Sequence, residues 1–383
     1  MSNTDFERSE FDLRHKRARQ AMEKAGIDLL IATSPASINY LVGSRSKAYL
    51  GFQCLLFPLA PGKNTLLAKK TELAEHLDLS IADECVGHGG PAPEDPVVVL
   101  HRLLKERDYG RLRVGLEMPA FYLRPQHYQQ IKDLLEDRLV DATSLLEELK
   151  FVKSPKEIEY IKRAASMADA GLRAGLAAMK PGRTEFEVVA EINRAVTALG
   201  SDQTASPVNM ISGERCCYPH GLPTERTLVE GDFVNIEFGA AYRRYCSTIG
   251  RQYSIGLPTP RMQEIYDAAR AATDACIAAM GPGVPLTVPH EAAKKEIDDR
   301  GFGAFRLHTT GYGVAAAFPP SWMDTIQMFD NDPRILEPGM MLSVEPPIFI
   351  HSERLGARVI ENVLITENGH EVLSRETRDL IVI

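Results

Sequence analysis

Apolar and polar residues in the first 150 positions alternate in the pattern of helices and strands. The basic segment 14–25 is typical of a helix that ends at Gly26, and the apolar run 27–32 follows it as an expected strand. Further strands are expected at 55–59 and 114–116, and further helices at 71–79 and 97–107. This alternation predicts an α/β layer.

A domain boundary is predicted near residue 150, in keeping with a length of 383 residues. Ser154 can cap a helix whose first residue is Pro155, and Glu157 completes a capping box. The expected domains are therefore 1–150 and 151–383.

The second of these domains contains a short internal repeat. The segment Ala-Ala-Met-Lys-Pro-Gly at 177–182 returns as Ala-Ala-Met-Gly-Pro-Gly at 278–283, an offset of 101 residues (278 − 177). Each copy closes a helical segment and precedes another, so two similar helix pairs are expected.

Composition argues against two classes of protein, those that bind nucleic acid and those that span a membrane. A net charge of −8 argues against nucleic acid as a partner, and no stretch approaches the length of a membrane span. The six cysteines are unevenly spaced, and the N-terminal residues are charged without an apolar segment. We expect free thiols and a cytoplasmic protein.

Several motifs resemble, in order, those of X-prolyl aminopeptidases, prolidases and creatinase. They are residues 231–240, 308–313, 337–346 and 361–366, while 18–43 resembles the N-terminal domain of creatinase and prolidase. The resemblance implies an α+β fold: a pita-bread C-terminal domain preceded by a smaller α/β creatinase-type domain.

The same resemblance exposes a difference in the ligand set. Where those peptidases have Asp, Asp, His, Glu and Glu, this chain has Glu237, Thr248, Tyr312, Glu345 and Ile360. Threonine and tyrosine are poor ligands for divalent ions, so we expect no metal and no cofactor. A one-residue shift of the last strand would bring Glu361 into the position of Ile360.

The resemblance, together with residue type, implies candidate roles for individual residues. His220, held between Pro219 and Gly221, aligns with the histidine that handles a proton in creatinase, and histidine titrates near neutral pH. The other expected catalytic residues are Glu237, Glu345 and His308. Those expected to bind substrate are Tyr312, Thr248, Glu361, Arg243 and Arg358.

The leading functional hypothesis is a metal-independent hydrolase of a C–N bond in a small zwitterionic solute, similar to ectoine hydrolase and creatinase. His220 would activate water in such an enzyme. The alternatives are an X-Pro metallopeptidase, a non-catalytic binding protein on the same fold, and a lyase. The resemblance also implies a homodimer in which the partner's N-terminal domain, through residues 43–53, completes each site.

Overall fold

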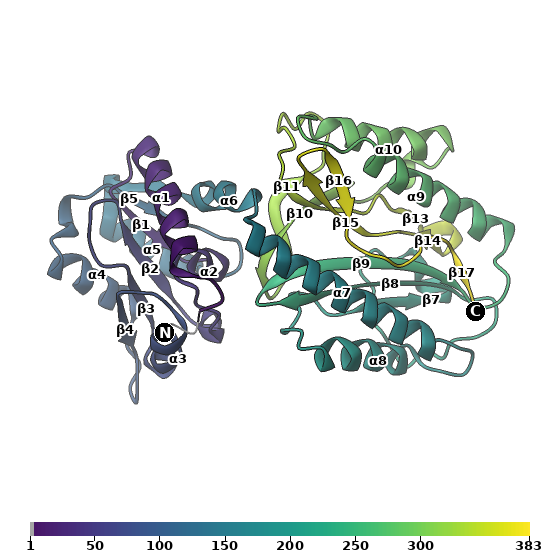
Figure 1. The fold of residues 1–383 in the computed structure, drawn as a ribbon. Coiled ribbons are helices and arrows are strands. Elements are labelled where there is room, and N and C mark those ends of the chain that lie inside the picture. The colour runs from purple at the N-terminus through teal and green to yellow at the C-terminus, as the bar shows by residue number, and fades with distance from the viewer. Residues whose placement is uncertain (1–3) are drawn as a thin grey trace. The chain divides into compact units, whose positions relative to one another are not determined.

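A computed structural model describes residues 4–383 of the chain, which divides into two compact units, Met1–Lys150 and Phe151–Ile383 (Figure 1). The expected fold class is confirmed: a creatinase-type N-terminal domain precedes a pita-bread domain. Among these residues, no helix is long and apolar enough to cross a membrane. All six cysteines are free thiols, as expected.

The N-terminal domain is a six-stranded mixed sheet in the order β4-β3-β2-β1-β5-β6, with helices packed on it (Figure 1). Its strands are β1 (Leu29–Ala32), β2 (Cys54–Pro58), β3 (Thr65–Lys69), β4 (Glu84–His88), β5 (Val114–Leu116) and β6 (Leu139–Asp141). Its helices are α1 (Arg8–Ala25), α2 (Pro35–Val42), α3 (Leu73–Leu79), α4 (Pro96–Glu106), α5 (Pro125–Leu135) and α6 (Thr143–Phe151).

A buried carboxylate organises the carboxyl end of this sheet. Glu117 follows β5, and its Oε2 accepts hydrogen bonds from the backbone N–H groups of Thr33 and Ser34, each at 2.9 Å. The Ser37 hydroxyl donates to its other oxygen. Glu117 thus accepts from the two backbone N–H groups that directly precede α2.

Glu117→Ala is expected to destabilise the protein by roughly 2–4 kcal/mol, because two buried N–H groups lose their acceptor. Glu117→Gln keeps an oxygen that both N–H groups can share, and should cost less. Thermal unfolding followed by circular dichroism tests this order. Equal melting temperatures for the wild type and Glu117→Ala would contradict it.

The C-terminal domain is built on a nine-stranded sheet. Its main path is β16-β15-β12-β10-β9-β8-β7, with β11 beside β10 and β17 beside β9. The strands are β7 (Asn209–Ser212), β8 (Phe233–Tyr242), β9 (Tyr245–Ser254), β10 (Gly311–Phe318), β11 (Ser321–Gln327), β12 (Met341–Val344), β15 (Glu361–Thr366), β16 (Gly369–Val372) and β17 (Ile381–Val382). A separate hairpin joins β13 (Ile348–Ile350) to β14 (Leu355–Ala357).

Two helix pairs cover this sheet, one on each half (Figure 1). The pairs are α7 (Pro155–Ala178) with α8 (Glu185–Ala198), and α9 (Pro260–Ala278) with α10 (Thr287–Asp299). The first pair shares a core with β7 to β9, and the second with β12, β13 and β15. The repeated segments 177–182 and 278–283 lie where α7 and α9 end. The repeat in the sequence therefore occurs at equivalent positions of the two helix pairs.

The start of α7 has the predicted cap. The Ser154 hydroxyl accepts a hydrogen bond from the Glu157 backbone N–H, and the Glu157 carboxylate accepts one from the Ser154 N–H. This reciprocal pair satisfies two of the N–H groups that open the first helix of the domain.

Candidate active site

The sheet register gathers the candidate residues around a cavity of about 130 Å³. Neighbouring strands place Asn209 opposite Glu237, and Tyr312 opposite Ser343. The cavity is lined by Ser206, Asn209, His220, Glu237, His308, Tyr312, Pro320, Ser321, Trp322, Met323 and Glu345. All four predicted catalytic residues, His220, Glu237, His308 and Glu345, therefore share one cavity.

Glu237 is held on one side of the cavity by two donors. Its Oε2 accepts a hydrogen bond from Asn209 Nδ2 at 2.9 Å and forms an ion pair with Arg358 Nη2. Both Glu237 and Arg358 are buried. A buried carboxylate needs such partners, and here the protein itself supplies them.

Tyr312 and Glu345 form a hydrogen-bonded chain that begins at the single tryptophan. Trp322 Nε1 donates to the Tyr312 hydroxyl at 2.9 Å, and this hydroxyl donates to Glu345 Oε2 at 3.1 Å. The Ser343 hydroxyl lies 3.4 Å from the same oxygen. Because Oε2 already accepts hydrogen bonds, a proton on Glu345 would be carried by Oε1.

The two histidines lie next to each other at the cavity. Their ring centroids are 5.6 Å apart, with His308 partly buried and His220 exposed. His308 Nδ1 lies 3.4 Å from Glu345 Oε1 and 3.2 Å from its neighbour's carbonyl oxygen, that of Thr309. Since a carbonyl oxygen only accepts, this contact requires the hydrogen on Nδ1, which leaves a lone pair on Nε2.

The environment moves the pKa values of an adjacent acid and base in opposite directions. Burial raises the pKa of Glu345 to about 8, and the negative charge of Glu237 adds to this effect. Burial lowers the pKa of His308, and the positive charge of Arg358 adds to that effect. Near neutral pH the site therefore contains a protonated carboxyl group beside a neutral imidazole, which is the arrangement of an acid–base pair.

The groups in the five ligand positions do not suit a pair of divalent ions. Glu237 is neutralised by Arg358, and the Thr248 hydroxyl accepts from Asn362 Nδ2 at 2.8 Å. Burial raises the pKa of the Tyr312 phenol well above its ordinary value, so that it stays neutral. Ile360, in the fifth position, is a fully buried hydrocarbon. Only Glu345 keeps a ligand group without a cation beside it.

Three predicted substrate-binding residues lie apart from the cavity lining. Glu361 is paired with Arg251 at 2.6 Å, because a residue next to Ile360 on a strand faces the other way. Arg243 donates to the Tyr160 hydroxyl at 2.9 Å and lies over that ring. Thr248 is bonded into the sheet through Asn362. Of the expected substrate-binding set, Tyr312 lines the cavity and Arg358 contacts it through Glu237.

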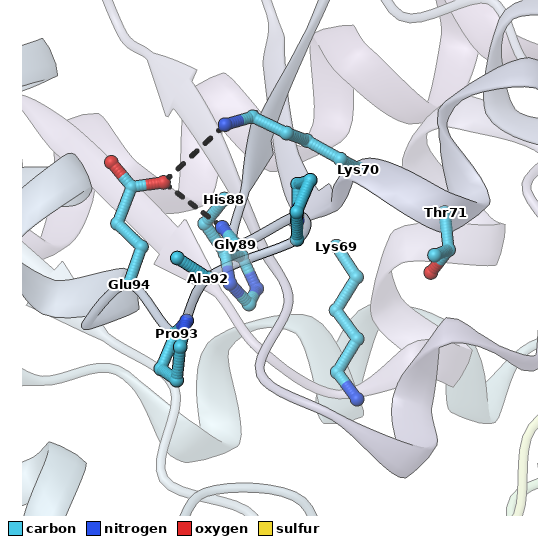
Figure 2. A pocket seen from close by; sticks show the side chains of 10 residues that line it. Lys69, Lys70, Thr71, His88, Gly89, Ala92, Pro93 and Glu94 are labelled. Carbon is cyan, nitrogen blue, oxygen red and sulfur yellow. Dashed lines mark hydrogen bonds and ion pairs between the residues drawn. The ribbon is translucent and has the colours of Figure 1, made fainter.

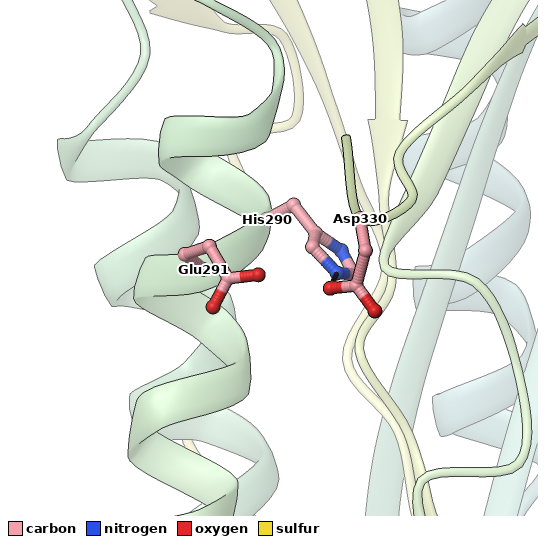
Figure 3. A group of neighbouring side chains, drawn as sticks. All are labelled: His290, Glu291 and Asp330. Carbon is pink, nitrogen blue, oxygen red and sulfur yellow. Dashed lines mark hydrogen bonds and ion pairs between the residues drawn. The ribbon is translucent and has the colours of Figure 1, made fainter. Parts of the chain in front are cut away.

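Away from this cavity, one group among residues 4–383 has metal-ligand geometry: His290, Glu291 and Asp330 (Figure 3). The two imidazole nitrogens of His290 already contact the Thr310 hydroxyl at 2.8 Å and Asp330 at 3.0 Å. Asp330 also pairs with Lys294. These contacts explain the cluster as a link between α10 and the segment after β11.

A larger groove lies on the N-terminal domain, next to β3 and β4. Figure 2 shows Lys70 and the Gly89 N–H directed at Glu94, whereas Lys69 extends away from them. The Nε2 atom of His88 forms a hydrogen bond with the Phe52 carbonyl oxygen at 2.9 Å. The groove therefore offers lysines and a paired carboxylate, without an acid–base pair like that of the C-terminal cavity.

Comparison with known families identifies both domains. Residues 14–152 match the creatinase/prolidase N-terminal domain, and residues 159–367, more than half of the chain, match metallopeptidase family M24. The protein belongs to this family.

Similar proteins cover nearly the whole chain. The uncharacterised peptidase SH1217 of Staphylococcus haemolyticus is 30% identical over 89% of this chain and 93% of its own. A solved Xaa-Pro dipeptidase from Bacillus anthracis is 26% identical, with a TM-score of 0.85 over 97% of this chain and 100% of its own. Dipeptidase PepE from Mycobacterium ulcerans is 29% identical, with a TM-score of 0.84 over 99% of both chains.

These relatives correct the functional expectation. A hydrolase of a C–N bond outside peptides is contradicted, because the family and the similar proteins are peptidases. The metal-independent, ectoine-hydrolase-like subtype is contradicted by the same metallopeptidase relatives, although the groups in the five ligand positions of this chain differ from theirs as described above.

Sequence reasoning missed three polar residues of the site: Asn209, Ser343 and Asn362. Each is a buried polar residue with an apolar neighbour in its strand, and this juxtaposition was the signal in the sequence. Asn362 is the residue that holds Thr248, through both its amide oxygen and its amide nitrogen.

Proposed function

We propose that the protein is a peptidase that hydrolyses Xaa-Pro dipeptides or peptides of similar size. The observation that carries the proposal is the acid–base pair Glu345 and His308 in a small cavity, on a chain that resembles an Xaa-Pro dipeptidase over 97% of its length. The proposed specificity for a peptide bond is inferred from the similar proteins. The proposed acid–base mechanism is inferred from the side chains in the cavity.

The side chains support a balanced hydrolysis. The lone pair of His308 Nε2 takes a proton from water as the water oxygen adds to the peptide carbonyl carbon. When the carbon–nitrogen bond then breaks, Glu345 gives its Oε1 proton to the departing nitrogen. Return of the proton from His308 to Glu345 restores the starting state. His220, at the exposed side of His308, provides a route for proton exchange with solvent.

The proposal predicts release of free proline from Ala-Pro and other Xaa-Pro dipeptides, measured by a colorimetric proline assay. Pro-Ala, which has the reversed order, is the matched control and should not react. Each substrate is tested after EDTA treatment and with added Mn²⁺, so that the result does not depend on metal supply. No proline release above the rate of heat-denatured protein in either condition would refute the proposal.

The homodimer, completed by residues 43–53 of a partner, stays a prediction, as does the cytoplasmic location. Light scattering of the purified protein measures the first directly.

A further inference from the structure

Arg358 is a buried guanidinium group with most of its hydrogen-bonding capacity unused. Only 1% of the residue is exposed, and its Nη2 is paired with Glu237. Among residues 4–383, Nε and Nη1 of Arg358 have no hydrogen-bond partner. Burying charged donors without acceptors costs free energy, so these two groups require an explanation.

A second buried arginine of this domain has hydrogen-bond partners for all of its donor nitrogens. Arg251 is also 1% exposed and also paired with a buried glutamate, Glu361. Its remaining donors bind backbone carbonyl oxygens, those of Gly250, Ile360, Glu376 and Thr377. The fold can therefore satisfy a buried arginine completely, and at Arg358 it does not.

Arg358 lies next to the cavity lining, in contact with one of its residues. Its Nη2 contacts Glu237, one of the cavity-lining carboxylates, and the Asn235 side chain fixes its backbone by donating to its carbonyl oxygen at 3.2 Å. Its positive charge acts on His308, Tyr312 and Glu345, so it lies beside the acid–base pair. A ligand in the cavity would approach this charge.

We propose that the donors of Arg358 left free by Glu237 bind an anionic oxygen of the ligand. This inference rests on the proposed function for the identity of the ligand, and it deepens that function. Two sources of the oxygen share this chemistry: the C-terminal carboxylate of the dipeptide, and the oxyanion formed when water adds to the peptide carbonyl. Glu237 is then the group that orients Arg358, because it fixes one nitrogen of the planar group.

Three ligands that are not hydrolysed separate the sources. L-proline carries the carboxylate, L-prolinamide lacks it, and a phosphinic analogue of Ala-Pro amide carries only the oxyanion mimic. Trp322 is the single tryptophan of the chain and lines the cavity, so its fluorescence reports binding, with calorimetry as a second readout.

Arg358→Met is expected to weaken binding of the ligand that uses this site by about 10- to 100-fold, with little change for prolinamide. A loss for proline assigns Arg358 to the carboxylate, and a loss for the phosphinic amide assigns it to the oxyanion. Arg358→Lys keeps a charge for Glu237 but has fewer directed donors, and should lose part of the affinity while folding normally.

Arg251→Met is the matched control: it should lower the melting temperature and leave ligand affinity unchanged. Changes below threefold for all three ligands in both Arg358 variants would overturn the proposal, as would the absence of saturable binding to the wild type. If the wild type fails to hydrolyse Ala-Pro while binding still depends on Arg358, the proposed function falls and this inference stands.

Discussion

Replacing Glu345 with Gln is expected to lower kcat/KM for an Xaa-Pro dipeptide by ~10²–10⁴-fold, the usual contribution of a general acid or base. The amide preserves the shape and accepts from Tyr312, but it cannot donate a proton to the departing nitrogen. The wild-type pH profile should be bell-shaped. Activity falls as the pH rises through about 8, where Glu345 loses its proton, and falls at acidic pH, where His308 gains one. The alkaline limb should be absent from the residual activity of Glu345→Gln.

The stability of the same variant gives an independent check. The pKa of Glu345 is raised in the folded protein, so its neutral form contributes stability at low pH that is lost as the pH rises through about 8. Glu345→Gln should therefore melt at a higher temperature than the wild type at pH 9, and the gain should shrink toward pH 5. If kcat/KM of the wild type does not change between pH 7 and 9, Glu345 is not the general acid.

The sequence predicted the parts of the fold that depend on local chemistry. The capping box at Ser154 and Glu157 fixed the start of α7, and Gly26 fixed the end of α1 with a left-handed backbone. The strand β3 (Thr65–Lys69) was missed, because a short apolar run gives no periodicity with which to distinguish it. The start of α1, residues 8–13, was missed because polar and charged residues outnumber apolar ones there.

The site was predicted less evenly, for a physical reason. The resemblance of the motifs to those of the family implied that His220, Glu237, His308 and Glu345 act at one site, and all four line one cavity. The face of the sheet to which a strand residue points depends on the register of that strand, and the sequence near Ile360 did not reveal this register. The pairing of β12 with β15 fixes the register, and the Glu361 side chain then forms an ion pair with Arg251. The substrate class needed relatives, because the same cavity groups suit more than one kind of C–N bond.

His220→Ala is expected to reduce kcat/KM by about 10- to 100-fold, less than the loss in Glu345→Gln because His220 exchanges protons with solvent and not with the substrate, while the melting temperature stays the same. His220 is exposed, and it lies on a turn between Pro219 and Gly221, so its removal opens no cavity in the core. Its ring meets that of His308 edge to face, and in the proposed mechanism it exchanges protons between His308 and solvent. Added imidazole should restore part of the lost activity, since the deleted ring leaves accessible space at the cavity mouth.

The matched control is His101→Ala, because His101 is also an exposed histidine but lies on α4 of the N-terminal domain. It should retain full activity, with and without imidazole. Rescue confined to His220→Ala is the signature of proton transfer, because a structural role for the ring would not respond to a free base. Near-normal kcat/KM in His220→Ala would instead leave proton exchange to His308 alone, and the cavity would then work without a histidine at its mouth.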